Sequence, residues 1–590
     1  MFCIYGKYLY ENPLRSMRCF QSVEIQEALR SMQQDKRGFW VGYVCYEALQ
    51  IAESKTPLLE FILFKTRRKW NFYAMDSTFS LQSPYFYPHI LQDCNPQGYA
   101  KAFASIKEEI AKGNTYQVNF TQELHLKSHC SGFEIFKALN LRQKTKYRCY
   151  FKSDAIEILS FSPELFFKIR NQKIIFQPMK GTMRRGNTKK EDENFKKLLQ
   201  KDSKNQSENL MIVDLLRNDM SQIIKLSTLK IPRLLKILKF KTLFQMVSTL
   251  KAQLNTKDLF AIFTAVFPCG SITGAPKAST MRIIKQLEKR DRGVYCGALG
   301  VLKKAKATFS VPIRTLTYKA NEGFYRYGVG SGIVWESDGL EEFRELQLKT
   351  QFLFPPLEFA LFETMLLYEN KVFLLHKHKE RLLKSAKMLG FNRQKLGFLQ
   401  NIQAEQALTS LCLEDFFTLS YAEPLKWAWG EFLECEKFGI RVLKEYSKLH
   451  LVLHKNGEFS FTQSPLDSIK THQVGIAALR LNAQNDLLYH KTTLREERSI
   501  AKNYFDMLYF NQSGELCEGA RSNIAVLKDG MLLTPFVSCG LLGGTLREVL
   551  LECGILKETV LKKEDLLAAK NVYCMNALRG VLPVQLAREA

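Results

Sequence analysis

Short runs of alternating hydrophobic and polar residues recur along the chain and predict many strands interleaved with helices. Residues 158–176, ILSFSPELFFKIRNQKIIF, have the pattern of two short strands, and the next ten, QPMKGTMRRG (177–186), have the composition of a turn. By contrast, SENLMIVDLLRND (207–219) has a helical pattern that Glu208 opens. This mixture predicts an α/β or α+β fold.

The pattern changes near TQFLFPPLEFALFET (350–364), where Pro355 and Pro356 end a charged helical segment and a new strand pattern begins. We expect a domain boundary there, with an N-terminal lobe at 1–95, a second region at 96–354 and a C-terminal domain at 355–590. The lobe is rich in aromatic residues and carries no dense motif, so it is expected to pack with the first domain. Neither half contains an internal repeat.

Composition supports a multidomain globular protein, because 590 residues exceed what one core usually holds. The net charge of +26 is compatible with nucleic acid, a membrane surface or anionic small molecules as partners. However, the lysines are spread over both halves, and the densest run, KLSTLKIPRLLKILKFK (225–241), alternates them with leucines. Without zinc-ligand spacing, an RNA-binding aromatic signature or a basic tail, nucleic-acid binding is disfavoured.

The cysteines and the apolar runs bear on location. The fourteen cysteines lack paired CxxC spacing, and the first residues lack the long apolar core of a signal peptide. No apolar run reaches the roughly 18 residues that a membrane-spanning helix needs. We therefore expect reduced thiols and a soluble, cytoplasmic protein.

Seven segments of the first half carry dense polar or glycine-rich motifs. They are GNTYQVNFTQ (113–122), SPELFF (162–167), PMKGT (178–182), SENLMIVDLLRND (207–219), FPCGSITGAPKASTMRIIKQLE (267–288), FSVPIRTL (309–316) and YGVGSGIVWESDGLEEFRELQLK (327–349). In this order they resemble the chorismate-utilising enzymes, which include anthranilate synthase, isochorismate synthase and aminodeoxychorismate synthase component I. The resemblance covers about residues 95–350 and implies large antiparallel sheets packed as a sandwich and flanked by helices.

Carboxylates and glycines of these segments suggest a ligand site. Glu208 and Glu345 could meet as hard oxygen ligands of a divalent ion, or could simply solvate helix faces. The resemblance implies the first alternative, with both residues binding Mg2+. Glycine backbone N–H groups and an arginine suit the two carboxylates of chorismate. By resemblance, the substrate-binding residues are Gly181, Thr182, Gln245, Tyr295, Arg314, Gly330, Gly332 and Lys349.

Lys180 of PMKGT is either part of a solvated basic loop or a reactive amine. Anthranilate synthases carry alanine at this position, whereas aminodeoxychorismate synthases of the covalent type carry lysine, so the resemblance favours the second reading. It implies that Lys180 adds to C2 of the ring while the 4-hydroxyl departs, with Glu164 as the general acid. An amine adds to carbon only when unprotonated, a state that burial and a nearby divalent cation favour. Ammonia then adds at C4 and expels the lysine, giving 4-amino-4-deoxychorismate.

Two features qualify this resemblance. Many relatives have a histidine where this chain has Gln245, and glutamine does not titrate near neutral pH, so no acid or base role is transferred to it. Gln245 remains a candidate for a hydrogen bond to the substrate. In addition, the chain contains no Gly-x-Cys-x-Gly segment of a glutaminase. We therefore expect a separate glutamine amidotransferase subunit as partner, or direct use of free ammonia.

The second half carries other motifs in a consistent order: FALFETMLLYENKVFLLHKHKERLLKSAKMLGF (359–391), YHKTTLREER (489–498), DMLYFNQSGELCEGARSNIAVLKDGMLLTP (506–535), GLLGGTLREVLLE (540–552) and NALRG (576–580). They resemble fold-type IV pyridoxal-phosphate enzymes, a group that includes branched-chain aminotransferases and aminodeoxychorismate lyase. The resemblance implies two α/β subdomains with pyridoxal 5′-phosphate between them, and commonly a homodimer.

The same resemblance assigns the cofactor contacts. Lys491 would form the Schiff base, because the cofactor must be held by an amine that substrate can displace. Glu518 would face the pyridine nitrogen and keep it protonated. The phosphate would be bound by Arg381, Ser522, Asn523 and Thr545, the last of which opens a helical segment suited to an anion.

Three functions are consistent with the sequence. The leading one is a bifunctional enzyme in which the second half removes pyruvate from 4-amino-4-deoxychorismate and leaves 4-aminobenzoate for folate. The second keeps the synthase but makes the C-terminal half an aminotransferase for a branched-chain or D-amino acid. The third is a scaffold that binds chorismate or a glutaminase without turnover, which the intact set of candidate catalytic residues disfavours.

Overall fold

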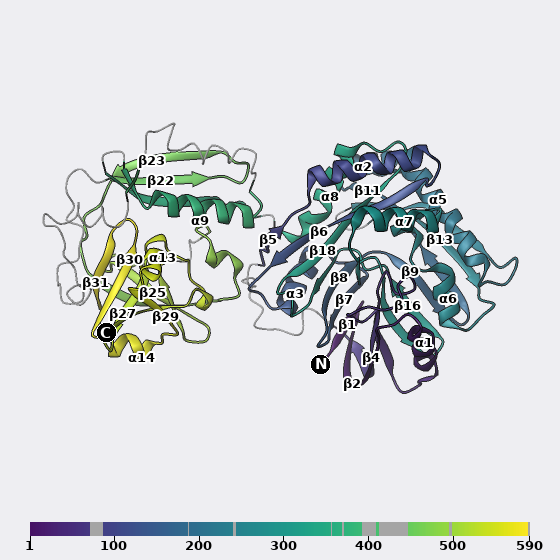
Figure 1. The fold of residues 1–590 in the computed structure, drawn as a ribbon, viewed down its shortest axis with the longest axis horizontal. Helices are drawn as coiled ribbons and strands as arrows, with labels where there is room; N and C mark the ends of the chain where they lie inside the picture. Colours follow the sequence, from purple (N-terminus) through teal and green to yellow (C-terminus); the bar gives the residue numbers. More distant parts are fainter. Residues whose placement is uncertain are drawn as a thin grey trace. The chain divides into compact units, whose positions relative to one another are not determined.

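The computed structural model describes residues 1–70, 86–186, 188–239, 243–355, 357–368, 371–391, 409–411, 447–494 and 498–587. The chain forms two compact units (Figure 1). Unit 1 comprises Met1–Leu81, Leu91–Lys127 and Gly132–Leu353. Unit 2 comprises Gln82–Ile90, Ser128–Ser131 and Phe354–Ala590.

Unit 1 is built on antiparallel strands. They are β1 (Cys3–Tyr5), β2 (Tyr8–Cys19), β3 (Phe39–Val44), β4 (Leu59–Lys69), β5 (His89–Gln92), β6 (Gln117–Lys127), β7 (Tyr147–Lys152), β8 (Glu157–Ser162), β9 (Leu165–Arg170), β10 (Lys173–Gln177), β11 (Met179–Arg184), β12 (Lys230–Lys239), β13 (Leu243–Gln253), β14 (Gly274–Ala275), β15 (Ala298–Lys303), β16 (Lys306–Ser310), β17 (Thr315–Tyr318) and β18 (Tyr325–Ile333). These eighteen strands of the described residues are hydrogen-bonded into one sheet system, in which His89 and Ile90 of β5 are the only residues that the division above assigns to unit 2.

The helices of unit 1 are α1 (Glu24–Gln34), α2 (Pro96–Ala111), α3 (Gly132–Arg142), α4 (Lys189–Lys201), α5 (Ser203–Ser221), α6 (Leu259–Val266), α7 (Lys277–Glu288) and α8 (Gly339–Thr350), with 3-10 turns η1 (Gly270–Ile272) and η2 (Gln351–Leu353). Figure 1 shows α2 and α8 on the side of unit 1 opposite α1, β2 and β4. Asn95 caps α2 ahead of a proline in the first turn, and Asp338 caps α8. Phe167, Phe263 and Phe309 are buried together in a hydrophobic cluster of unit 1.

Two local expectations for unit 1 are wrong. The segment expected to be a turn around Lys180 is strand β11, which pairs with β13 and contains a register shift between Lys180 and Thr182. Gly181 at that shift has a φ of +71°, a conformation that favours glycine. The helix that Glu208 was expected to open begins at Ser203, because Asp202 accepts a hydrogen bond from the backbone N–H of Asn205.

Unit 2 contains two sheets. The five-stranded sheet has the order β21-β20-β19-β22-β23, from β19 (Leu361–Tyr368), β20 (Lys371–Phe373), β21 (Thr409–Leu411), β22 (Ser447–Leu453) and β23 (Phe459–Pro465). The eight-stranded sheet has the order β26-β25-β24-β31-β30-β27-β28-β29, from β24 (Gln473–Leu481), β25 (Asp506–Asn511), β26 (Leu516–Gly519), β27 (Asn523–Lys528), β28 (Met531–Pro535), β29 (Leu556–Thr559), β30 (Asn571–Asn576) and β31 (Gly580–Leu586).

The helical elements of unit 2 include α9 (Leu375–Met388), α13 (Thr545–Glu552), α14 (Lys563–Ala568), η3 (Asp486–Tyr489) and η4 (Val537–Cys539). Parallel pairs such as β24 with β25 stand beside antiparallel ones such as β27 with β30, so the sheet is mixed. The mixed α/β class expected from the sequence is confirmed. Pro356, one of the two prolines expected at the boundary, lies outside the described residues. None of the helices in the described part of the chain is both long and apolar enough to cross a membrane.

Candidate active sites

Lys180 lies among buried groups in unit 1. Its Nζ is 3.7 Å from Glu208 Oε2, and the two side chains are only 12% and 11% exposed. A Cβ built on Gly332 would lie 3.2 Å from the same Nζ, so the amine faces β18. Strands β11 and β18 and helix α5 therefore bring together three residues predicted separately, and the alternative of a solvated basic loop does not fit this environment.

Gln117 on β6 belongs to this site, although it was not among the residues predicted from the sequence. Its Nε2 donates to Glu208 Oε2 at 3.3 Å and lies 2.4 Å from where a Cβ on Gly332 would be. Only glycine at 332 admits this approach. The Oε1 atom of Gln117 is buried and has no hydrogen-bond partner among the described residues. The residue stands in the segment GNTYQVNFTQ, but nothing in that pattern distinguishes it from a structural glutamine.

Glu164 is a buried carboxyl group near the same amine. Ser271 Oγ donates to its Oε1 at 2.7 Å. Burial raises the pKa of Glu164 to about 7, against the opposing effects of the Ser271 hydrogen bond and the Lys180 charge. Such a group exchanges a proton near neutral pH, as a general acid must. Ser271 is a second site residue that was not predicted from the sequence.

Acidic side chains crowd around Glu208. Burial raises the pKa of Glu208, and the charges of Glu342 and Glu345 add to this effect, while Lys180 and Lys204 oppose it. A divalent cation would relieve such repulsion between oxygen donors. Glu208 and Glu345 thus fit a Mg2+ site in their chemistry, although the described residues hold no cluster of three or more acidic, histidine or cysteine ligands.

The three acidic residues differ in their partners. Glu345 Oε1 lies 2.7 Å from Lys349 Nζ, which also donates to the carbonyl of Gly330 at 2.7 Å. Glu342 is more deeply buried and accepts hydrogen bonds from Ser337 Oγ at 2.7 Å and Lys204 Nζ at 2.9 Å. Lys349, expected in the substrate pocket, therefore bridges α8 and β18.

Arg314 is suited to a carboxylate. It has a φ of +53°, and no hydrogen bond or ion pair of its guanidinium is found with the described residues. Burial lowers its pKa, against the effect of Tyr327. Arg314 is partly buried, and a cation in such a place without an acidic neighbour is stabilised by an anionic ligand.

The other expected substrate contacts come from several strands. Tyr295 is buried and its ring would lie 2.4 Å from a Cβ on Gly328, so it covers β18. Gln245 is buried on β13 opposite Thr182, whose side chain lies outside the described part. Gly330 pairs with Thr121 of β6.

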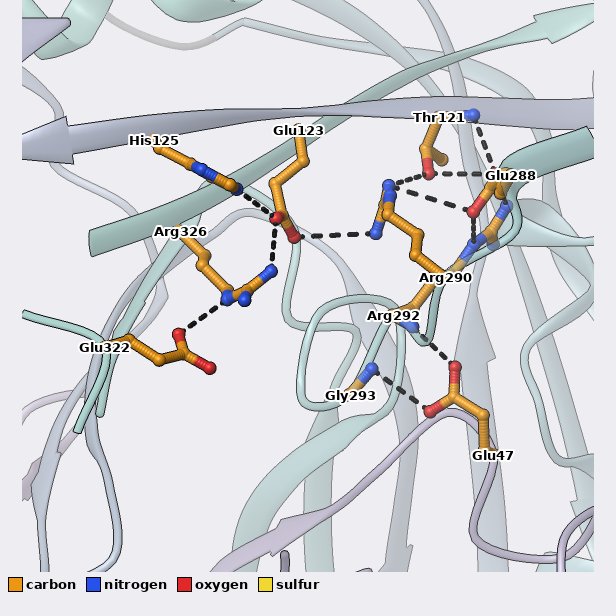
Figure 2. A network of polar contacts seen from close by, with 10 residues as sticks. All are labelled: Glu47, Thr121, Glu123, His125, Glu288, Arg290, Arg292, Gly293, Glu322 and Arg326. Carbon is orange, nitrogen blue, oxygen red and sulfur yellow. Dashed lines mark hydrogen bonds and ion pairs between the residues drawn. The ribbon is translucent and has the colours of Figure 1, made fainter. Parts of the chain in front are cut away.

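A network of ion pairs and hydrogen bonds stabilises the part of unit 1 around Thr121 and Arg292 (Figure 2). Arg292 Nη2 lies 2.6 Å from Glu288 Oε1, and their side chains are 1% and 0% exposed. Glu288 accepts the backbone N–H of Thr121 at 2.8 Å, and Glu47 accepts those of Arg292 and Gly293 at 2.6 and 3.1 Å. Because Thr121 of β6 pairs with Gly330 of β18, the network connects Arg292, three residues before Tyr295, to this pair of strands.

Lys491 in unit 2 lies close to strand β19. Its Nζ is 4.0 Å from Glu363 Oε2 and 5.2 Å from the centre of the Phe362 ring. The Lys491 carbonyl accepts the backbone N–H of Phe362 at 3.0 Å, which fixes the loop against the strand. Arg381 of α9 also contacts Glu363, with Nε 2.9 Å from Oε1.

An anion cradle lies at the start of α13. This helix has no side-chain cap, so its first backbone N–H groups remain available. Arg381 Nη1 donates to the carbonyl of Gly543 at 3.1 Å, and a Cβ on Gly543 would meet nothing within 4 Å. A Cβ on Gly544 would collide with Asn523 Oδ1 at 1.9 Å, so this approach requires glycine. These residues, with Thr545 in the first turn, fit a phosphate group.

Two predicted cofactor contacts have partners in the protein itself. Glu518 forms an ion pair with Arg498, and both side chains are 4% exposed. The Ser522 hydroxyl bonds to the carboxylate of Asp506, which is fully buried. The carboxylate of Glu518 is thus held by a buried arginine, and the single hydroxyl proton of Ser522 is directed at Asp506.

The fold and the first of these sites define the class of the protein. Residues 6–355 match the model of the family described as chorismate binding enzyme, which is more than half of the chain. The chain belongs to the chorismate binding enzyme family. Residues 452–587 match a second model, described as amino-transferase class IV, so the C-terminal part is a class IV aminotransferase domain.

Curated relatives match the first half. Aminodeoxychorismate synthase component 1 of Escherichia coli is 35% identical over 263 residues, 44% of this chain and 57% of that protein. Probable anthranilate synthase component 1 of Schizosaccharomyces pombe is 34% identical over 251 residues, 42% of this chain and 51% of that protein. The chain thus spans about half the length of the curated relatives it matches.

A solved structure supports the fold of the first half. Anthranilate synthase component I from Streptococcus pneumoniae superposes with a TM-score of 0.52 and 20% identity, over 60% of this chain and 92% of that one. Identity at this level shows a shared fold alone.

Proposed function

We propose that the chain is a bifunctional enzyme of 4-aminobenzoate synthesis for folate. The first half converts chorismate and ammonia into 4-amino-4-deoxychorismate, and the second half eliminates pyruvate from that product to leave 4-aminobenzoate. The observation that carries the first activity is the amine of Lys180, buried beside Glu208 and Gly332. In this proposal residues 1–95 are the N-terminal lobe, 96–354 bind chorismate and 355–590 bind the cofactor.

Two side chains carry the first reaction. The Lys180 amine adds to C2 of the ring as the C4–oxygen bond breaks, and Glu164 gives its proton to the departing hydroxyl so that water leaves. The pKa of about 7 means that a substantial fraction of Glu164 holds this proton at neutral pH. Ammonia then bonds to C4 as the bond from C2 to Lys180 breaks, which restores the free lysine.

Binding of chorismate in this proposal uses separate groups for its two carboxylates. Arg314 and the backbone of Gly330 and Gly332 bind carboxylate oxygens. Glu208 and Glu345 would hold Mg2+, which supplies positive charge for a substrate carboxylate. The ammonia comes from a glutamine amidotransferase subunit, in agreement with the "component 1" in the names of the relatives.

The second reaction in this proposal uses the residues around Lys491. Arg381, Asn523, the start of α13 at Thr545 and, through its backbone, Ser522 would hold the phosphate of pyridoxal 5′-phosphate, and Glu518 would face its ring nitrogen. The cofactor supplies an electron sink when bound. Lys491 removes the proton at C4 of the substrate ring, and the ring becomes aromatic as the enolpyruvyl oxygen leaves. A homodimer through this domain belongs to the proposal.

A second candidate keeps the synthase and makes the C-terminal domain an aminotransferase. The match of residues 452–587 to the class IV model favours no reaction within that class, so this candidate remains. Both functions are located in the cytoplasm in our proposal.

Product analysis tests the proposal. Purified protein with chorismate, ammonia, Mg2+ and pyridoxal 5′-phosphate is expected to form 4-aminobenzoate and pyruvate in equal amounts. Lys491→Ala should accumulate 4-amino-4-deoxychorismate, and Lys180→Ala should fail to form it or divert to an anthranilate-like product. Accumulation of 4-amino-4-deoxychorismate by the unaltered protein would instead favour the aminotransferase. Unchanged rate and product in Lys180→Ala would refute the role of this amine.

A further inference from the structure

Glu363 is a buried carboxylate on β19 with an unusual set of neighbours. Its side chain is 2% exposed. Arg381 donates to it twice, from Nε to Oε1 at 2.9 Å and from Nη2 to Oε2 at 2.5 Å. His378, one helical turn before Arg381 on α9, places Nδ1 2.7 Å from Oε2. Lys491 Nζ is 4.0 Å from the same oxygen. One carboxylate thus faces three side chains that can carry positive charge.

The protonation states of this group follow from its charges. Burial alone would raise the pKa of Glu363, but the charges of Arg381, His378 and Lys491 outweigh it and lower the pKa. Burial lowers the pKa of His378, Arg381 and Lys491 add to the effect, and Glu363 opposes it. On β22, His450 has its pKa lowered by burial and then by Lys491, with Glu363 acting against it. Near neutral pH, Glu363 is therefore ionised.

The ionised carboxylate fixes the imidazole. A carboxylate only accepts hydrogen bonds, so Nδ1 of His378 carries the proton that bonds to Glu363. In the neutral ring Nε2 is then an acceptor, and it faces Thr545 Oγ1 at 3.5 Å. Glu363 is thereby connected, through His378, to the first residue of α13.

The same carboxylate fixes the guanidinium. Arg381 has five N–H groups, of which two point at Glu363 and one at the Gly543 carbonyl. Two N–H groups remain for a ligand, beside the uncapped start of α13 and the open space at Gly543. Without Glu363 the guanidinium would lose the two bonds that define its plane, and its remaining donors would no longer be held toward the phosphate cradle.

We propose that Glu363 is a positioning residue of the cofactor site, which orients Arg381 toward the cofactor phosphate and places a negative charge beside the nitrogen of Lys491. This inference rests on the proposed function of the C-terminal domain. It makes two separate predictions: one concerns affinity for the phosphate, and the other concerns the pH at which the nitrogen of Lys491 loses its proton once joined to the cofactor.

The test uses Glu363→Gln in the full chain, because glutamine has nearly the same shape but no charge. Equilibrium dialysis of the cofactor-free protein measures binding of pyridoxal 5′-phosphate and, as a matched probe, of pyridoxal without phosphate. We expect the variant to lose about tenfold to a hundredfold in affinity for the phosphorylated form and much less for pyridoxal. The pH midpoint of the absorbance of the bound cofactor should fall by about one unit, since a nearby negative charge favours the protonated nitrogen.

Two further variants guard the interpretation. Glu380→Gln removes an exposed carboxylate next to Arg381 on α9 and should change neither measurement. Glu363→Asp keeps the charge but shortens the side chain. Its pH midpoint should therefore stay close to that of the unaltered protein, while its affinity for pyridoxal 5′-phosphate should fall. Circular dichroism establishes whether each variant is folded. If Glu363→Gln does not fold, the affinity of Glu363→Asp for pyridoxal 5′-phosphate tests the orientation of Arg381. The pH midpoint of Glu363→Asp then tests whether a negative charge at this position maintains the protonated nitrogen of Lys491.

The outcomes separate the inference from the function beneath it. Unaltered protein that binds no pyridoxal 5′-phosphate overturns both the cofactor assignment and the role of Glu363. Unaltered protein that binds it, together with a Glu363→Gln variant of equal affinity and equal pH midpoint, overturns the role of Glu363 alone. A parallel loss of affinity for pyridoxal and for pyridoxal 5′-phosphate contradicts orientation through Arg381.

Discussion

Replacement of Ser271 by alanine is expected to shift the pH dependence of the synthase reaction. Ser271 donates its hydroxyl to Glu164 at 2.7 Å and so stabilises the ionised carboxylate. A hydrogen bond to a charged group contributes about 1.5–3 kcal/mol, and one pKa unit corresponds to about 1.4 kcal/mol. Loss of this bond should therefore raise the pKa of Glu164 from about 7 by roughly one to two further units.

The sign of the effect follows from the proposed role of Glu164 as a general acid. A general acid must hold its proton, so activity persists below its pKa and falls as the pH rises through it. The alkaline limb of kcat/KM for chorismate should lie near pH 7 in the unaltered protein and about one to two units higher in Ser271→Ala. Its maximal rate is expected to fall if Ser271 also contacts the substrate, but the midpoint reports on Glu164 independently of that loss.

The assay measures formation of 4-amino-4-deoxychorismate with the concentration of unprotonated ammonia held constant at each pH. Ser271→Thr retains a hydroxyl and serves as the matched control, with a midpoint close to that of the unaltered protein. Glu164→Gln should remove the limb together with most of the activity. An alkaline midpoint that stays in place in Ser271→Ala, or moves to lower pH, would refute the assignment of this limb to Glu164.

Three other predictions concern the first unit. Chelation of divalent cations should abolish chorismate turnover, and added Mg2+ should restore it; full activity in the presence of chelator would contradict the proposed metal role of Glu208. Gly332→Ala should lower synthase activity about tenfold to a hundredfold, because its Cβ would meet Gln117 at 2.4 Å. The internal control is elimination of pyruvate from supplied 4-amino-4-deoxychorismate, which should not change. Arg292→Leu should lower the free energy of unfolding of unit 1 by about 3–5 kcal/mol, measured by denaturant unfolding, because it leaves the Glu288 carboxylate buried without its closest cation. The double variant Arg292→Leu with Glu288→Leu should recover part of this loss.

Local patterns predict the fold class of this chain better than its element boundaries. The alternation in residues 158–176 corresponds to strands β8, β9 and β10, one more than predicted. The segment around Lys180 has turn composition, yet it is a strand because β13, more than sixty residues later, supplies its hydrogen bonds. Pairing between distant segments overrides local propensity here, and Gly181 provides the bulge that the pairing requires rather than a chain reversal.

The first site shows a similar division between local and distant information. Lys180, Glu208 and Gly332 were each proposed from a separate motif, and the fold brings them within a few ångströms. Gln117 and Ser271 stand inside quoted motifs but were not recognised. Their significance depends on atoms of other elements: Gln117 matters because Glu208 and Gly332 lie against it, and Ser271 because Glu164 does.

The residues missed in unit 2 have the same explanation. In the sequence, Glu363 and His378 look like ordinary polar positions of a strand and a charged helix. Only the packing of α9 on β19 makes them a buried pair that shares Arg381. Conversely, Ser522 was expected at the phosphate from its motif, and its hydroxyl is directed at Asp506, a contact that the local pattern does not contain.

The two lysines have similar neighbours but opposite electrostatic surroundings. Each amine lies about 4 Å from a glutamate with a mostly buried side chain, at 3.7 Å for Lys180 and 4.0 Å for Lys491. Around Lys180, burial prevails over the nearby lysines and raises the pKa of Glu208, so this carboxylate is short of positive charge. Around Lys491, cations prevail over burial and lower the pKa of Glu363, so this carboxylate lies in an excess of positive charge. A divalent cation would stabilise a site of the first kind and a phosphate a site of the second kind, so the same pair of side chains suits the two different chemistries that we propose for this chain.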